Sequence, residues 1–386
     1  MNPNNSNLTR REMALGVASC AIAPHFTASA EPMSAAQNIK ELLEPIRKES
    51  DLPALAAIAL KDGKVIAKGA VGFRKYDDPT PVTMQDKFHL GSCTKALTAH
   101  LCASLIERGR LRRTTPLAKA LPDMAQLMHP AYRSITLDHL LCHRSGFPTE
   151  SWLKGRDFQE TRRFPGNTAQ QREAFLRAIL QEAPDAEPGT KYIYSNRNYS
   201  VAGVLAERAD NDLWEVALQS RVFAPLKIHS AGYGSMGTPG AIDQPWQHVM
   251  NGKERGIIAP GPNSDNPATI APGGVVHISL EDWAKFVQDH LTGLRGEGGV
   301  LKPESYKYLH TPLFKGDYAG GWISTERGWG GGKVYTHSGS NTQNFAVVWM
   351  APLKNFAVLV ATNQGGDDAA KATDRVAAAI IQNFLT

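Results

Sequence analysis

Strand-like apolar runs stand at both ends of this 386-residue chain, and helical patterns dominate the sequence between them. Near the start, the runs at 55–60 and 65–71 flank Asp62-Gly63, a pair typical of a two-residue hairpin turn. Near the end, further runs follow at 319–325, 333–337, 345–350 and 356–361. Because consecutive elements are usually joined by short connections, this order predicts an antiparallel sheet assembled from both ends of the chain.

Apolar residues at helical spacing predict helices beside this sheet at 34–50 and 368–384, and others at 93–108, 137–142, 170–181, 199–208 and 214–223. The stretch 231–274 is rich in Gly and Pro without clear periodicity, which predicts a long functional or mobile loop. We therefore expect an α/β fold of the α+β type. Residues 31–80 and 271–386 form its sheet lobe, and residues 81–270 form an inserted helical lobe with a pocket loop at 231–270. A cleft between two such lobes is the natural place for a site.

Composition and charge exclude several classes of protein. The chain is 42% hydrophobic and 20% charged, as in ordinary globular proteins, which excludes a mostly disordered, collagen-like or coiled-coil chain. Its net charge of +5 is mild and its basic residues are scattered, so we expect no nucleic-acid partner. No apolar run reaches the roughly 18 residues that a membrane-spanning helix needs, so we expect no membrane span.

The first 30 residues have the pattern of an export signal. Arg10-Arg11 is a twin-arginine start, the stretch 13–23 is weakly apolar, and Ala28-Ser29-Ala30 fits a signal-peptidase site. This pattern predicts a periplasmic or secreted protein. Two alternatives stay open: the residues before Cys20 loosely resemble a lipoprotein box, which would put a lipid anchor on Cys20, or the segment is simply a frayed terminus.

The other three cysteines are Cys93, Cys102 and Cys142. They are odd in number and form no C-x-x-C pair, so neither a disulfide framework nor a thiolate zinc site is expected. We expect them to be small buried apolar residues.

Ser92-Cys93-Thr94-Lys95 is the candidate for nucleophilic catalysis. A serine nucleophile needs a base within hydrogen-bond reach and amide donors aimed at the developing oxyanion. Gly91 allows a sharp turn, and Ser92 then lies in the first turn of the predicted helix, where its N–H is free. Lys95 follows three residues later on the same helical face. The S-x-x-K pattern alone is weak, and a second copy at 151–154 has no predicted helix to carry it.

Two further motifs supply partners for such a serine. Tyr194-Ser195-Asn196 precedes a predicted helix; a Tyr beside a Lys can act as a phenolate base, and an Asn can orient a carbonyl. Alternatively, Tyr192 and Tyr194 are core aromatics and Asn196 is a helix N-cap. His337-Ser338-Gly339-Ser340 ends a predicted strand, and its small residues permit close approach of a ligand. Here the alternative is a plain hairpin turn.

In the order Ser92, Tyr194, His337, these motifs resemble the serine β-lactamase and penicillin-binding protein superfamily. The Tyr-x-Asn form resembles the class C β-lactamase and D-alanyl-D-alanine carboxypeptidase branch, which also contains esterases. The resemblance covers residues 34–385. It includes the stretch 135–146, similar to the "iT-LL-H-SG" of that branch, and the pairs Pro188-Gly189, Pro225-Leu226, Gly273-Gly274 and Thr362-Asn363.

The resemblance implies a role for each motif residue. Ser92 would be the acylated nucleophile, Lys95 its proton partner, Tyr194 the general base and later the acid, and Asn196 a carbonyl-orienting residue. The backbone N–H groups of Ser92 and Ser340 would form the oxyanion hole, and His337, Ser338, Gly339 and Ser340 would bind substrate. No metal or cofactor is implied. Lys95 helps as a base when neutral, or as a cation that keeps Tyr194 ionised, and the sequence does not choose between them.

His337 departs from the β-lactamase pattern, which has a lysine there. Histidine is mostly neutral near pH 7, so binding of a substrate carboxylate should be weaker. We therefore expect acyl-serine hydrolysis of an amide or ester, with a β-lactam, a D-amino-acid peptide or a small carboxylic ester as the substrate. A catalytically silent ligand-binding or sensor module is the contrasting hypothesis. His139 and His143 are four apart, as in zinc sites, but no Glu follows His139 as in H-E-x-x-H, so a packing role is expected.

Overall fold

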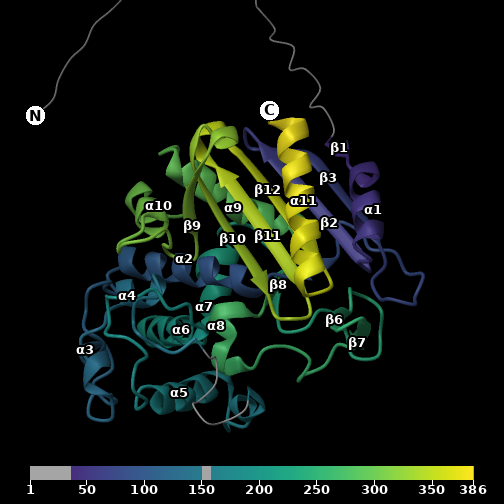
Figure 1. Ribbon diagram of the computed structural model, residues 1–386. Coiled ribbons are helices and arrows are strands. Elements are labelled where there is room, and N and C mark those ends of the chain that lie inside the picture. Colours follow the sequence, from purple (N-terminus) through teal and green to yellow (C-terminus); the bar gives the residue numbers. More distant parts are fainter. Residues whose placement is uncertain (1–35, 150–157, 386) are drawn as a thin grey trace, which may run out of the picture. The chain divides into compact units, whose positions relative to one another are not determined.

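The computed structural model of the protein describes residues 36–149 and 158–385 (Figure 1). The predicted export signal at 1–30, with Cys20, and the second S-x-x-K copy at 151–154 lie outside these ranges.

The main sheet has seven strands, and it is built from both ends of the chain as predicted. Its order is β1 (Gln37–Asn38), β3 (Lys64–Gly72), β2 (Ala54–Lys61), β12 (Phe356–Thr362), β11 (Phe345–Ala351), β10 (Gly332–Ser340) and β9 (Ile323–Arg327). Neighbouring strands are antiparallel except β1 and β3. Asp62 and Gly63 have φ of 51° and 76°, the positive values that a tight hairpin turn of this kind requires.

The central strands are buried on both faces. In β12, the side chains of Phe356, Val358 and Val360 pack in one apolar cluster, and those of Ala357 and Leu359 pack in another. The first cluster includes residues of α1 (Lys40–Glu49) and α11 (Asp367–Phe384), which cover one face of the sheet (Figure 1). The second includes residues of α9 (Leu280–Leu294), which covers the other face.

Helices dominate the middle of the chain. They are α2 (Thr94–Glu107), α3 (Leu117–Ala120), α4 (Leu137–Leu141), α5 (Thr168–Ile179), α6 (Asn196–Asp210), α7 (Trp214–Leu218) and α8 (Ala271–Gly274), followed after α9 by α10 (Pro303–His310). Helix α2 is buried on all sides and contacts both α6 and α10, so it joins the helical part to the rest. Cys93, Cys102 and Cys142 are buried free thiols, as expected.

Several elements differ from the sequence-based expectation. Helices α9 and α10 were not predicted, and the predicted helix at 34–50 begins at Lys40, after the short strand β1. The region predicted to be a loop contains β5 (Gly232–Tyr233) and the hairpin of β6 (Gln247–Asn251) and β7 (Glu254–Ile258). Most residues of this hairpin are half-buried, so its apolar alternation is weak. Strand β5 joins β4 (Lys87–His89) and β8 (Val276–Ser279) in a second sheet.

Among the residues that the structure describes, no helix is both long and apolar enough to cross a membrane.

Candidate active site

Ser92 lies in a 3₁₀ turn, Gly91–Cys93, immediately before α2. Two glycines let strand β10 pack directly against this turn. A Cβ on Gly91, whose φ is +48°, would lie 2.3 Å from the Ser340 nitrogen, and a Cβ on Gly339 would lie 2.6 Å from the Ser92 nitrogen. Any side chain at either position would push the two segments apart. The backbone amides expected to form the oxyanion hole therefore belong to segments in direct contact.

Lys95 is buried beside Ser92 at the start of α2. Its Nζ lies 3.0 Å from Ser92 Oγ, 2.6 Å from Asn196 Oδ1 and 2.8 Å from the Gly273 carbonyl oxygen. These partners are uncharged oxygens, so they offset little of the cost of burying an ammonium ion. Burial lowers the pKa of Lys95 from 10.5 to about 7, and the neighbouring Cys93 thiol raises it slightly. A lysine with such a pKa is neutral in a substantial fraction of molecules at pH 7.

Tyr194 lies just before α6, and Lys95 Nζ is 4.8 Å from the centroid of its ring. Burial raises the pKa of Tyr194 well above its usual range, and a hydrogen bond with Ser92 lowers it by less. The phenol therefore keeps its proton in the free protein. Tyr192 is 40% exposed, so the alternative in which it is a core aromatic residue is wrong.

Asn196 is the first residue of α6, and its side-chain Oδ1 accepts a hydrogen bond from Lys95 Nζ. The N-cap of this helix is Ser195, whose hydroxyl accepts the backbone N–H of Arg197. The alternative in which Asn196 is the N-cap is therefore wrong. The structure brings Ser92, Lys95, Tyr194 and Asn196 together, although they come from two segments about a hundred residues apart.

The third motif lies on the last residues of β10, where Ser338 and Ser340 are exposed and His337 is buried. Since a carbonyl can only accept, His337 Nδ1–H donates to the Ser338 carbonyl oxygen at 2.5 Å. Nε2 is then the acceptor for the Tyr318 hydroxyl at 2.9 Å. Burial, followed by the nearby Lys95 charge, lowers the pKa of His337 to about 3. His337 is thus neutral, and contact of this motif with a substrate stays a prediction.

His143 supports Tyr194 more directly than its predicted packing role suggested. Its carbonyl oxygen accepts the N–H of Ile193 at 3.0 Å, and its Nδ1 accepts the N–H of Ser195 at 3.2 Å. These bonds hold the residues on either side of Tyr194, and the two rings lie with centroids 4.4 Å apart. The place of His143 in the stretch 135–146 pointed to it, whereas Tyr318 had no recognisable sequence signal.

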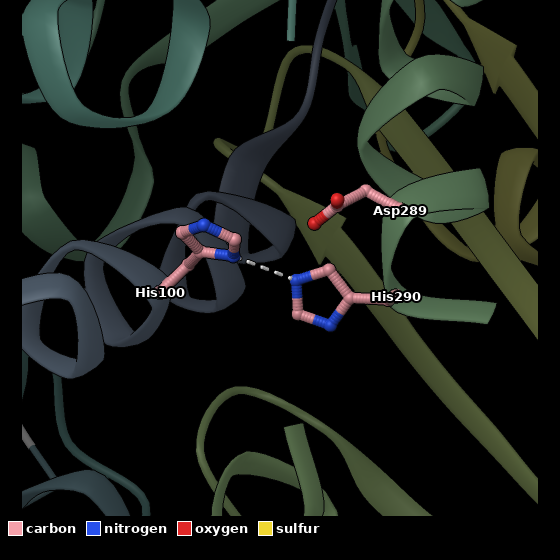
Figure 2. Close-up of side chains that lie close together, drawn as sticks. All are labelled: His100, Asp289 and His290. Atoms are coloured by element: carbon pink, nitrogen blue, oxygen red, sulfur yellow. Dashed lines mark hydrogen bonds between the residues drawn. The ribbon is translucent and has the colours of Figure 1, made fainter. Parts of the chain in front are cut away.

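One group of side chains in the described part of the chain has a composition suited to a metal ion: His100, Asp289 and His290, with ligand atoms within 4.8 Å of one another (Figure 2). Hydrogen bonds already account for most of these atoms. His310 donates to the Tyr306 carbonyl, so its other nitrogen accepts from His290, which in turn accepts from His100 Nδ1 at 3.1 Å. This series of hydrogen bonds puts a proton on His100 Nδ1, the nitrogen that faces His290, so that atom has no free lone pair for an ion.

Comparisons with known proteins agree with this geometry. The family model described as Beta-lactamase matches residues 36–382, and the chain therefore belongs to that family. Membership makes it a serine hydrolase. "Penicillin-binding protein 4" of Amycolatopsis lactamdurans is 27% identical over 343 residues, which cover 84% of each chain. A "Beta-lactamase" of Escherichia coli (strain K12) is 26% identical over 279 residues, covering 70% of this chain and 66% of that protein.

The fold is shared with solved structures. A D-amino acid amidase from Ochrobactrum anthropi SV3, crystallised with L-phenylalanine amide, superposes with a TM-score of 0.69 and 18% identity, covering 89% of this chain and 98% of the other.

Proposed function

We propose that the protein hydrolyses esters or amides through a covalent acyl-enzyme on Ser92. The observation that carries this proposal is the contact between Ser92 Oγ and Lys95 Nζ, 3.0 Å apart, in a buried setting that lowers the pKa of the lysine to about 7. A base works best when its pKa is near the working pH, since it is then both available and strong enough. The family match supports the reaction class.

Lys95 is the acylation base in this proposal. Ser92 Oγ attacks the substrate carbonyl carbon while its proton passes to the neutral Lys95 amine. The negative charge that develops on the carbonyl oxygen is stabilised by the backbone N–H groups of Ser92 and Ser340. This assignment differs from the one implied by resemblance, in which Tyr194 is the base, because burial disfavours its phenolate.

Tyr194 then acts as the acid. When the tetrahedral intermediate collapses, the bond to the leaving group breaks and the leaving group takes the phenolic proton. The Lys95 ammonium, 4.8 Å from the centre of the tyrosine ring, returns a proton to the phenolate. Water next attacks the acyl ester and gives a proton to Lys95. The departing Ser92 oxygen takes that proton back, which restores the free enzyme.

The preferred substrate is one without an essential carboxylate. At the third motif Ser338 and Ser340 are the exposed residues, and the ring of His337 is neutral and bound to Tyr318. The Ser340 hydroxyl already donates to the Asn344 carbonyl oxygen at 2.7 Å, so we assign substrate contact to the hydroxyl of Ser338. Hydroxyls bind neutral polar groups without the charge assistance that a lysine gives a carboxylate. Esters and amides of small acids therefore fit better than β-lactams or D-alanyl-D-alanine peptides.

The test is a substrate panel on the purified protein, with Ser92→Ala as the matched control. We expect steady turnover of p-nitrophenyl butyrate, and a lower kcat/KM for nitrocefin and for a D-Ala-D-Ala peptide. Ser92→Ala should remove turnover of all three. Release of at most one equivalent of p-nitrophenol would instead indicate a silent binding module. A preference for nitrocefin or the peptide would contradict the substrate assignment.

A further inference from the structure

A buried carboxylate outside the catalytic motifs, Asp265, is hydrogen-bonded to one residue near the Ser92 turn and to one residue at the end of β10. These are the two segments whose amides form the expected oxyanion hole. Asp265 lies in the connection between β7 and α8 and is 5% exposed. Its Oδ2 lies 2.7 Å from His89 Nε2, and its Oδ1 accepts from Asn341 Nδ2 at 2.7 Å. Burying a carboxylate costs several kcal/mol unless partners compensate, and here each oxygen has one.

His89 connects Asp265 to the turn that contains the nucleophile Ser92. Its Nδ1 accepts the backbone N–H of Gly91 at 3.0 Å, so the ring proton must be on Nε2, where it is donated to Asp265. Gly91 is the residue immediately before Ser92 and has the left-handed φ of +48°. The carboxylate thus fixes the tautomer of His89, and His89 in turn anchors the turn that presents Ser92.

Asn341 connects Asp265 to the end of β10. It follows Ser340 directly, and its amide nitrogen donates to Asp265 and, at 2.8 Å, to Gln247 Oε1. Its Oδ1 accepts the backbone N–H of Gln343 at 3.2 Å. The orientation of this amide is therefore set by Asp265 and Gln247 on one side and by the backbone after β10 on the other.

We propose that Asp265 is a positioning residue that holds the amide donors of Ser92 and Ser340 in the arrangement that stabilises the oxyanion. The proposal rests on the acyl-serine function given above and adds a residue that no catalytic motif contains. Asp265 touches no reacting atom; it acts through His89 on one segment and through Asn341 on the other. Its loss should weaken binding of the tetrahedral state more than binding of the substrate.

Asp265→Asn is the sharpest perturbation, because it keeps the size of the side chain and removes one acceptor. If the new amide nitrogen faces His89, that ring must move its proton to Nδ1 and can no longer accept from Gly91. If it faces Asn341, the Asn341 amide must turn over, and its bonds to Gln247 and to the Gln343 N–H are lost. In either orientation one of the two links is therefore lost: the bond from Gly91 to His89, or the bonds that orient the Asn341 amide.

The experiment compares wild type with Asp265→Asn, and uses Asp282→Asn as the matched control. Asp282 is a similarly buried carboxylate, but it accepts the N–H groups of His229 and Ser230. For Asp265→Asn we expect kcat on p-nitrophenyl butyrate to fall about tenfold to a hundredfold, with KM changed less than about threefold. Affinity for an alkyl boronic acid, which forms a tetrahedral adduct with the serine, should fall in parallel with kcat/KM. Asp282→Asn should change none of these values by more than about twofold.

Unchanged kcat and boronate affinity in folded Asp265→Asn would overturn the inference. The proposed function is tested separately, because it fails if a fluorophosphonate does not label Ser92 in the wild type. Should Asp265→Asn not fold, a pair of His89 variants decides. In His89→Asn an amide oxygen takes the place of Nδ1 and keeps the Gly91 bond, whereas His89→Gln keeps only the bond to Asp265. We expect the higher kcat for His89→Asn, and the reverse order would contradict the anchoring of Gly91.

Discussion

Replacing Lys95 with methionine keeps most of the apolar stem of the side chain and removes the amine. The structure buries this amine completely and lowers its pKa from 10.5 to about 7. In the unfolded chain the lysine is exposed and has its ordinary pKa. Between about pH 7 and pH 10.5, the unfolded state therefore binds one more proton than the folded state, and the free energy of unfolding of the wild type should rise with pH.

The size of this effect follows from linkage. One extra proton on the unfolded state corresponds to a slope of about 1.4 kcal/mol per pH unit. Below pH 7 both states are protonated and the full cost of the buried ammonium is present, about 5 kcal/mol for the shift from 10.5 to about 7. The free energy of unfolding of wild type minus that of Lys95→Met should then rise by about 2 to 3 kcal/mol from pH 7.5 to pH 9.5.

Urea unfolding curves of the two proteins at pH 6.5, 7.5, 8.5 and 9.5 measure this difference. Its absolute value at one pH also contains the hydrogen bonds lost at Ser92, Asn196 and Gly273, but its slope with pH does not. Other titrating groups are common to both proteins and cancel. Lys371→Met, at an exposed position on α11, is the control for replacing a lysine with methionine away from the site. A difference that stays constant within about 0.5 kcal/mol from pH 7.5 to 9.5 would refute a neutral Lys95 and with it the proposed base.

Three further results are expected. With p-nitrophenyl butyrate, kcat/KM should rise with pH through an apparent pKa near 7 as Lys95 loses its proton; a flat profile from pH 6 to 8 would argue for another base. Tyr194→Phe, assayed by steady-state kinetics on an amide, whose amine leaving group must be protonated, should lower kcat by about 10²-fold to 10⁴-fold, and near-normal turnover would exclude the tyrosine from proton transfer. In Gly339→Ala the new methyl group would lie 2.6 Å from the Ser92 nitrogen, so kcat should fall at least about a hundredfold and stability by about 1–3 kcal/mol. Wild-type kinetics in this variant would mean that β10 need not touch the nucleophile turn.

The sheet was predictable from the sequence because its strands are local apolar runs bounded by turn residues. Asp62-Gly63 fixed one hairpin, and the runs ending at Leu60 and Ala361 correspond to strands that do pair. Helix α9 has apolar residues at helical spacing, among them Trp283, Val287 and Leu291, so its pattern is present in the sequence although it was not predicted. Its buried residues also include Asp282, Asp289 and His290, which interrupt the apolar pattern. The hairpin of β6 and β7 was not predicted because little of it is buried.

The candidate site was predictable where a motif carries its chemistry in adjacent residues. Ser92 and Lys95 share one helical turn, and Tyr194 and Asn196 flank one N-cap. Their mutual distances, and the burial that sets the pKa of Lys95, depend on tertiary packing. Tyr318 bonds to His337, and Asp265 bonds to both His89 and Asn341, through side-chain contacts between residues that are 19 to 176 positions apart in the sequence. Such contacts leave no periodicity or spacing that a single sequence could show.

Mass spectrometry of the protein after reaction with a fluorophosphonate tests the central claim most directly. The proposed mechanism predicts one covalent adduct per chain, mapped by peptide analysis to Ser92 and absent from Ser92→Ala. A label that persists in Ser92→Ala, or that maps to Ser151, would contradict the assignment of Ser92 as the nucleophile.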